Sequence, residues 1–214
     1  MAKEWDMQID LPAGMTQARM QDWRQLGAIT AEAFYEDPVN RWIFGSPATL
    51  DAVFPLLART HYLRHGVCHM VGDGGAAMWL PWGAPGEVSV SAVLQIAWAL
   101  VRTGAIGAIG RALEAGDTMQ AHHPKEPHLY LFTLGTRLAY RGKGVGKMLL
   151  APVLAACDRD QMPIYLENSN PANQGFYRAH GFETLDFFAC GRDRGNQKAP
   201  QLERMWRAPR SGIL

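Results

Sequence analysis

The stretch that decides the fold is residues 129–150, which read LYLFTLGTRLAYRGKGVGKMLL. Its first eight residues carry the aliphatic and aromatic side chains that are typical of a buried strand. A glycine loop follows, and the apolar residues after it recur at the spacing of one helical face. Glycines let backbone N–H groups approach a phosphate closely, and the first turn of a helix adds its positive dipole end. The stretch therefore predicts a site for a pyrophosphate.

Two other kinds of glycine loop fit this stretch less well. A P-loop, G-x-x-x-x-G-K-[ST], aligned on Gly146 and Lys147 would have Arg141 at its first glycine and Met148 at its hydroxyl position. A dinucleotide fingerprint, G-x-G-x-x-G, requires a spacing that the alternating glycines do not match. The loop does match R-x-x-G-x-G at Arg141, Gly144 and Gly146. For this hexapeptide alone, an incidental glycine turn between a strand and a helix stays open as the alternative.

A second motif follows the glycine loop. Residues 163–167 form another apolar strand pattern, and residues 168–182 read NSNPANQGFYRAHGF. Asn170 suits the N-cap of a short helix, Pro171 its first position and Gly181 the residue just after its end. Asn173 and Tyr177 then lie on one face of that helix.

Together the two motifs resemble those of the GNAT acetyltransferases. The R-x-x-G-x-G loop is similar to the family's pyrophosphate loop, and the strand with its Asn-rich turn and Phe-Tyr pair resembles the part that lines the coenzyme thioester. The resemblance covers residues 129–188 well, and residues 37–44 and 203–207 more loosely. Within the family, the chain looks most like the puromycin N-acetyltransferase-like branch. Leu138 stands where many relatives have proline, which concerns the rigidity of the loop rather than its charge.

The resemblance implies an α/β (α+β) fold with a mixed, mostly antiparallel sheet that is splayed at the coenzyme site and flanked by helices. It implies one domain over residues 1–214, with its best-matched core at 129–188 and a helical insertion around 88–120. The implied reaction transfers an acetyl group from acetyl-CoA, a co-substrate, to a primary amine of a small molecule or peptide by direct attack in a ternary complex, without a metal. The alternatives are an inactive module of this fold that binds acyl-CoA, and a nucleotide-binding protein unrelated to coenzyme A.

The family mechanism assigns roles to particular residues. Tyr177 matches the usual general acid for the leaving thiolate, and Glu167 suits a general base. A core aromatic and a surface glutamate are the respective alternatives. Gly135 permits a distorted strand end that would aim a backbone N–H at the carbonyl oxygen. The expected coenzyme-binding residues are Leu134, Gly135, Thr136, Arg141, Gly142, Lys143, Gly144, Val145, Gly146, Lys147 and Asn173.

Recognition of the acceptor is expected in the N-terminal half. If several aromatic side chains there face the cleft, an amine on an aromatic or apolar body is favoured, and Glu36 or Asp37 would pair with its charge. A place in the core is the alternative for each aromatic. The candidates are Phe34, Tyr35, Trp42, Phe44, Trp79, Trp82 and Tyr130.

The rest of the chain alternates between helical and strand patterns. A helix is predicted over residues 16–35, with Thr16 as N-cap and an end near Asp37, followed by an aromatic loop at 42–47 and a helix at 50–64. Residues 67–71 and 76–80 predict a hairpin, and residues 88–120 two helices broken near Gly104. Residues 122–128, with His122 and His123, are predicted to be a solvated loop rather than a metal site. Pro152 should bend the helix after the glycine loop. Residues 203–207 are expected to form a closing strand.

Composition narrows the class of protein. The 214 residues are 48% hydrophobic and 19% charged, with a formal net charge of +1, which gives no reason to expect nucleic acid or an anionic membrane as partner. No apolar signal segment opens the sequence and no apolar run approaches about 20 residues, so we expect a cytoplasmic protein. Three cysteines without C-x-x-C spacing favour neither a disulfide framework nor a zinc site. A homodimer is left open.

Overall fold

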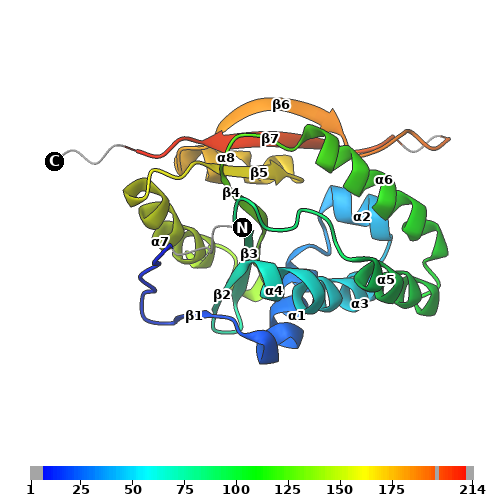
Figure 1. Ribbon diagram of the computed structural model, residues 1–214. Coiled ribbons are helices and arrows are strands. Elements are labelled where there is room, and N and C mark those ends of the chain that lie inside the picture. The colour runs from blue at the N-terminus through cyan, green and yellow to red at the C-terminus, as the bar shows by residue number, and fades with distance from the viewer. Residues whose placement is uncertain (1–6, 196–197, 211–214) are drawn as a thin grey trace.

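The central sheet has seven strands (Figure 1). The computed structural model describes residues 7–195 and 198–210, so the prediction about a signal segment, which rests on residues 1–6, lies outside the described residues. Among the described strands, only β4 and β5 pair in parallel. The expected mixed, mostly antiparallel sheet is confirmed. In sheet order the strands are β1 (Met15–Gln17), β2 (Val67–Val71), β3 (Gly75–Leu80), β4 (Leu129–Thr136), β5 (Ile164–Asn168), β7 (Gln201–Arg207) and β6 (Glu183–Ala189).

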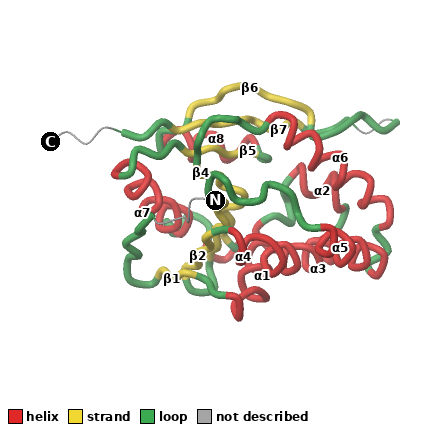
Figure 2. Tube along the Cα trace, viewed as in Figure 1, coloured by secondary structure: helices red, strands yellow, loops and turns green. Residues whose placement is uncertain are grey.

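Helices flank the sheet, with α7 apart from the group formed by α1, α3 and α5 (Figure 2). Short 3-10 turns at residues 20–22, 138–140 and 171–173 precede α1, the glycine loop and α8. None of the described helices combines the length and the apolar character that crossing a membrane requires. The helices are α1 (Trp23–Ala33), α2 (Pro38–Phe44), α3 (Pro47–Leu57), α4 (Leu63–His65), α5 (Val90–Arg102), α6 (Ile106–His122), α7 (Val145–Arg159) and α8 (Gln174–Ala179).

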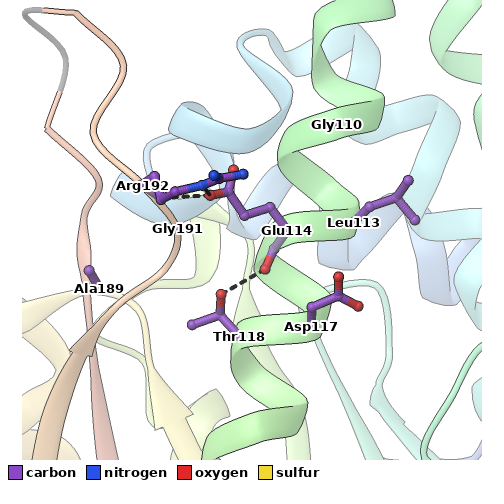
Figure 3. Close-up of a pocket in the computed structure, with 8 residues that line it drawn as sticks. All are labelled: Gly110, Leu113, Glu114, Asp117, Thr118, Ala189, Gly191 and Arg192. Atoms are coloured by element: carbon purple, nitrogen blue, oxygen red, sulfur yellow. Dashed lines mark hydrogen bonds and ion pairs between the residues drawn. The ribbon is translucent and has the colours of Figure 1, made fainter.

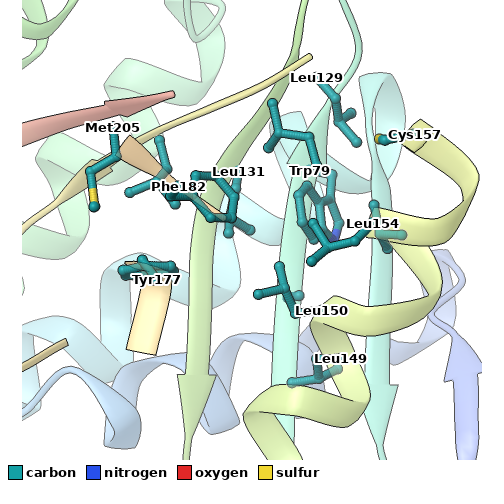
Figure 4. Packing of buried hydrophobic residues seen from close by; sticks show 14 of the residues in the cluster. Trp79, Leu129, Leu131, Leu149, Leu150, Leu154, Cys157, Tyr177, Phe182 and Met205 are labelled. Atoms are coloured by element: carbon teal, nitrogen blue, oxygen red, sulfur yellow. The ribbon is translucent and has the colours of Figure 1, made fainter. Parts of the chain in front are cut away.

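Two hydrophobic clusters cover the two faces of the sheet. On one face, Leu149 and Leu150 of α7 pack with Trp79 of β3 (Figure 4). On the opposite face, Leu26 and Ile29 of α1 are fully buried. Burying one such leucine or isoleucine stabilises the fold by roughly 1.5–3 kcal/mol relative to leaving it in water. The two clusters hold β3 and β4 between α7 and α1.

The N-terminal prediction is wrong in two respects. Thr16 is not an N-cap, because it lies in β1 and pairs with Met70. The helix starts later, at Trp23, and ends at Ala33. Burial of Met15, which is 5% exposed, favours an extended segment along β2 over another helical turn.

The aromatic segment at 42–47 is also not a loop. Asp37 accepts a hydrogen bond from the Asn40 N–H and Pro38 occupies the first position of α2, so the residues expected to end one helix begin another. Ser46 then caps α3 in the same way. A capping signal marks a helix start as well as a stop, and the sequence alone did not distinguish the two.

Other expectations are confirmed. The 50–64 helix exists and is longer, since α3 continues through a π-helical turn at 58–62 into α4. The β2–β3 hairpin and the break at Gly104, whose φ is +73°, are as predicted. The closing strand is β7, and Cys68, Cys157 and Cys190 are buried and unpaired. Strand β6, which has exposed Leu185 and Phe187, was not predicted because its apolar residues do not alternate cleanly.

An ion pair ties the last strand to α7. The Arg207 side chain is 2% exposed, and its two terminal nitrogens donate to the Asp158 carboxylate at 2.7 Å each. We expect Asp158→Ala to lower the free energy of unfolding by roughly 3 kcal/mol, because the guanidinium stays buried without its counter-charge. Urea denaturation measures this loss. The control, Asp160→Ala, removes an exposed partner of Arg159 and should cost below about 1 kcal/mol; equal losses would contradict the assignment.

The same pair makes stability depend on pH. Burial acts to raise the pKa of Asp158, but hydrogen bonds from Arg207 and from the Arg210 N–H outweigh it and lower the pKa. A carboxyl with a lower pKa in the folded state stabilises the fold above its unfolded pKa of about 3.9, and this contribution disappears as the pH falls through the lowered value. The difference in the free energy of unfolding between wild type and Asp158→Ala should therefore be largest at neutral pH and become smaller in acid.

Candidate functional site

The site begins where β4 and β5 separate. Residues 129–131 pair with residues 164–166, and the described register does not continue beyond them. β4 nevertheless runs on to Thr136 and β5 to Asn168. The edge of β4 that faces β5 therefore offers unpaired N–H and C=O groups from Phe132 onward, as an edge strand does. The predicted splay of the sheet is confirmed.

The distortion of β4 lies before the position that we predicted. Trp79 pairs with Leu131 and Met78 pairs with Thr133, so Phe132 is the extra residue of a β-bulge. Residues 134–136 pair regularly with β3, and the expected distortion at these residues is wrong in its position. Bulges re-aim the backbone and side chains of a strand. Here the bulge coincides with the first residue of the splay.

Gly135 serves close packing instead of a bend. A Cβ at this position would lie 2.7 Å from the Cβ of Ala33 and 3.5 Å from the ring of Phe34. The end of α1 can therefore approach β4 only because residue 135 has no side chain. This contact puts Phe34 beside the unpaired part of β4.

The glycine loop leads from β4 into α7. Gly142 and Gly144 have φ of +74° and +80°, in the region that favours glycine, and Gly144 is the N-cap of α7. The first α7 hydrogen bond runs from the Met148 N–H to the Gly144 carbonyl at 3.0 Å. The N–H groups of residues 145–147 thus lack an acceptor within the helix, as is usual for a first turn. The loop presents these donors to an anion, so its backbone fits a phosphate group.

Around this backbone, the charged residues of the loop are exposed. Arg141 donates to the Ala33 carbonyl at 3.1 Å, and the Lys143 ammonium lies 5.5 Å from the Tyr140 ring centre. Lys147 is exposed on the first turn of α7, and Val145 is buried beneath it. Three exposed cationic side chains therefore surround the loop.

The loop, the end of β4 and α8 converge. A Cβ at Gly146 would lie 3.4 Å from the ring of Phe176 and 3.9 Å from the Thr136 hydroxyl. Gly146 therefore lies next to both Phe176 of α8 and the end of β4. The glycine loop and the second sequence motif, which are separated along the chain, thus form two sides of one region.

Helix α8 is held at both ends. The Asn170 side chain accepts a hydrogen bond from the Ala172 N–H, and Pro171 follows it, as predicted. At the other end, the Phe182 N–H donates to the Tyr177 carbonyl and the Gly181 N–H donates to the Arg178 carbonyl, which is a Schellman motif. These caps fix the helix that carries Tyr177.

Tyr177 lies on the inner side of α8, while Asn173 is exposed on the turn that precedes it. The Tyr177 ring is 5.7 Å from that of Phe182, with which it packs in the core cluster (Figure 4). Burial, and next the charge of Asp37, raise the pKa of the Tyr177 phenol well above its usual range. The phenol therefore stays protonated at neutral pH and suits a proton donor.

Glu167 is not a surface residue. Its side chain is 2% exposed and lies on the opposite face of β5 from the α7 cluster. The Tyr130 hydroxyl donates to Oε2 at 2.6 Å, whereas Oε1 is buried without a hydrogen-bond partner among the described residues. A buried carboxylate oxygen that lacks a donor is a group to which a proton or an ammonium can be delivered.

The histidine segment differs from the predicted solvated loop. His122 ends α6 and its ring stacks on Phe188 at 4.1 Å. His128 is 1% exposed, and its Nε2 lies 3.0 Å from the Nε2 of His123. Burial lowers the pKa of His128 to about 4. Six residues, 123–128, connect α6 to β4, and packing with residues distant in sequence buries His128.

The acidic candidates for the acceptor are engaged in other contacts. Glu36 pairs with Arg41 at 2.7 Å on the surface. Asp37 is 5% exposed and accepts hydrogen bonds from Asn40 and from the Ser169 hydroxyl. The Ser169 contact ties the start of α2 to the end of β5, a link that the sequence did not indicate.

The predicted aromatic wall is only partly present. Trp79 and Trp42 are 1% and 5% exposed and belong to hydrophobic clusters. Trp42 borders a surface cavity beside α2, away from the splay. Tyr130 is held by Glu167, and Trp82 packs against His128 with 5.3 Å between ring centres. Phe34, half-buried beside Gly135, is the aromatic residue of this set that borders the splay.

Two surface cavities lie away from the splay. The first, about 540 Å³, lies between α6 and the segment after β6, where Arg192 lowers the pKa of Glu114 to about 2 (Figure 3). The second, about 490 Å³, lies beside α2. Neither is lined by a residue predicted for coenzyme binding or catalysis. The candidate site is instead the open edge between β4 and β5. Within the described chain, no cluster of three or more His, Cys, Asp or Glu side chains suits a metal ion.

Comparison with known proteins agrees with this geometry. The model of the Acetyltransferase (GNAT) family matches residues 91–182. An uncharacterized N-acetyltransferase of Schizosaccharomyces pombe is 27% identical over 205 residues, which cover 88% of this chain and 80% of that protein.

Solved structures share the fold. Histone acetyltransferase HPA2 and related acetyltransferase from Corynebacterium glutamicum superposes with a TM-score of 0.63 at 22% identity, over 94% of this chain and 98% of the other. A GNAT superfamily phosphinothricin acetyltransferase from Sinorhizobium meliloti, in complex with AcCoA, gives 0.54 at 15% identity, over 94% and 90%. Residues 91–182 therefore match the GNAT family of acetyltransferases, and the chain shares its fold with solved acetyltransferases of that family.

Proposed function

We propose that this protein transfers the acetyl group of acetyl-CoA to a primary amine of a small molecule or peptide, by direct attack in a ternary complex. The observation that carries the proposal is the splay of β4 and β5, with phosphate donors at one end and the buried carboxylate of Glu167 beside it. The Sinorhizobium meliloti relative in complex with AcCoA supports the choice of coenzyme.

The coenzyme is assigned to one side of the splay. Its phosphates suit the loop, where backbone donors and flexible cations converge. Its pantetheine amides suit the unpaired edge at Leu134, Gly135 and Thr136, because an added chain can pair there as a strand would. Asn173, which is exposed on the turn before α8, is assigned to the pantetheine as well. The full phosphate-binding set is Arg141, Gly142, Lys143, Gly144, Val145, Gly146 and Lys147.

The chemical step uses one proton acceptor and one donor. Attack of the amine forms the N–C bond while its surplus proton passes to Glu167. The C–S bond then breaks, and Tyr177 donates its phenolic proton to the thiolate before it is reprotonated from solvent. Negative charge on the carbonyl oxygen requires an N–H donor, which the bulged backbone near Phe132 is suited to supply. The products are an N-acetylated amine and free coenzyme A.

In this proposal, the acceptor is an amine that carries an apolar or aromatic substituent. Phe34 borders the splay, and Phe132 stacks on Tyr62 at 4.2 Å on the same face of the sheet as Glu167. An apolar surface next to a carboxylate favours an ammonium with a hydrophobic substituent.

Coenzyme binding tests the loop directly. We expect Arg141→Gln to raise the Kd of acetyl-CoA about 10-fold, since one charge-assisted hydrogen bond contributes roughly 1.5 kcal/mol. Calorimetric titration measures this, with ATP and NAD as competing ligands. Arg24→Gln, whose guanidinium stacks on Trp23 away from the loop, should bind like wild type.

A screen of amines then separates enzyme from binding module. Turnover of phenethylamine or of a peptide with a free N-terminus supports the proposed reaction. Saturable binding of acetyl-CoA without turnover of any amine would instead favour an inactive acyl-CoA-binding module. Preferential binding of ATP would mean that the glycine loop serves another nucleotide.

A further inference from the structure

Next to the buried carboxylate of Glu167 lies His123, and His128 lies next to His123. In the proposed function, on which this inference rests, Glu167 gains a proton in each turnover and must lose it again. Its side chain is 2% exposed, so it has little direct access to water. His123 Nδ1 faces Glu167 Oε1 at 3.9 Å, and the His123 side chain is 24% exposed. We infer that His123 carries this proton from Glu167 to solvent, and that His128 holds His123 in the tautomer that can accept it.

The hydrogen bonds determine the tautomers. His128 Nδ1 lies 2.7 Å from the Glu126 carbonyl, which can only accept, so Nδ1 carries the hydrogen. Because His128 is buried and neutral, its Nε2 is a lone pair. The His123 Nε2, 3.0 Å away, must then be the donor. This leaves His123 Nδ1, the atom that faces Glu167, as the lone pair of the neutral ring.

Aromatic neighbours hold the His123 ring in this orientation. Its centre lies 5.0 Å from the Tyr130 ring at an interplanar angle of 90° and 5.2 Å from the Tyr165 ring at 83°. Edge-to-face contacts of this kind prefer a fixed geometry. Since Tyr130 also donates to Glu167, one residue orients both the carboxylate and the imidazole. At 3.9 Å the two groups are close enough for transfer after a small movement or through one water.

No other described group near Glu167 competes for the proton. Burial raises the pKa of the tyrosine and cysteine side chains around it, so they stay protonated at neutral pH. Arg204 is a permanent cation whose guanidinium pairs with Asp186 at 2.9 Å. Besides His123 and His128, the ionisable groups from the surrounding elements are Tyr62, Tyr130, Tyr165, Cys190 and Arg204.

The proton is balanced over one turnover. The amine loses it to Glu167 Oε1 as the N–C bond forms. Glu167 passes it to His123 Nδ1, which becomes an imidazolium with hydrogens on both nitrogens, and the imidazolium releases it to water. The lone pair on His123 Nδ1 accepts the proton and is restored when the proton leaves. Both histidines act through Glu167, so they are positioning residues and do not touch the substrate.

The test compares three histidine variants with acetyl-CoA and phenethylamine as substrates. We expect His123→Ala to lower kcat at pH 7 about 10-fold, with an unchanged Kd for acetyl-CoA, and added imidazole to restore part of the rate. His128→Ala should also lower kcat, and both variants should change the pH profile of kcat. His122→Ala is the matched control, because the His122 Nδ1 bonds to the Thr118 carbonyl and its ring stacks on Phe188. Its pH profile should equal that of wild type.

Nitrogen-15 NMR of the wild-type protein provides a second measurement that needs no variant. Neutral His123 should carry its hydrogen on Nε2, and hydrogen on Nδ1 instead would overturn the inference. A His123→Ala variant with wild-type kcat and pH profile, while Glu167→Gln is impaired, would overturn the relay alone. Absence of amine turnover in wild type would instead reject the proposed function, and the relay with it.

Discussion

Tyr177→Phe is expected to lower kcat about 100-fold while the Kd of acetyl-CoA stays unchanged, because loss of a general acid costs roughly 10²–10⁴-fold in rate. The substitution removes one hydroxyl and keeps the ring that packs on Phe182 and Phe176. Steady-state kinetics with acetyl-CoA and the accepted amine, together with calorimetric titration, measure the two quantities separately.

The control for Tyr177 is another tyrosine hydroxyl. Tyr35→Phe removes a hydroxyl that donates to Asp51 at the surface, and we expect it to leave kcat within about twofold of wild type. Because burial and Asp37 raise the pKa of Tyr177, any decline of wild-type activity due to its ionisation should lie above pH 10. Equal kcat in Tyr177→Phe and wild type would remove the general-acid role.

Glu167→Gln is the second large expected effect. The amide has nearly the shape of the carboxylate and can still accept the Tyr130 hydrogen bond, but it cannot take a proton from the amine. We expect kcat/KM to fall about 100-fold at pH 7, within the range of lost general-base catalysis.

A surface carboxylate provides the comparison for Glu167. The control is Glu183→Gln, because Glu183 is exposed on β6. The kinetics of this variant should match those of wild type. Thermal melting of both variants separates a kinetic effect from partial unfolding. If Glu167→Gln retained full activity, the amine would have to lose its proton to another base or to water.

Local signals explain why much of the site could be predicted. Gly144 adopts a positive φ, Asn170 caps the turn before α8 and Gly181 closes its Schellman motif. Each of these needs only residues that are close in sequence. The strand patterns of β4 and β5 were equally local. The resemblance to the family then supplied the expectation of a mixed, splayed sheet and the expected role of Tyr177, which no periodicity contains.

Errors arose where the same local signal permits two structures. Asp37 and Pro38 were interpreted as a helix end, and they begin α2. Thr16 was interpreted as a cap, and pairing with β2 makes it part of a strand. In both cases contacts with distant residues, the Ser169 hydroxyl for Asp37 and Met70 for Thr16, favour the observed structure.

The sequence by itself determined the glycine loop, the capped α8 and the alternation of helices and strands, because short-range dihedral preferences and capping hydrogen bonds encode them. Only the tertiary structure decided that the bulge falls at Phe132, that Glu167 is buried, and that His123 and His128 extend from it. These features depend on pairing register and on desolvation by residues far apart along the chain. Neither quantity exists until the fold has brought those residues together.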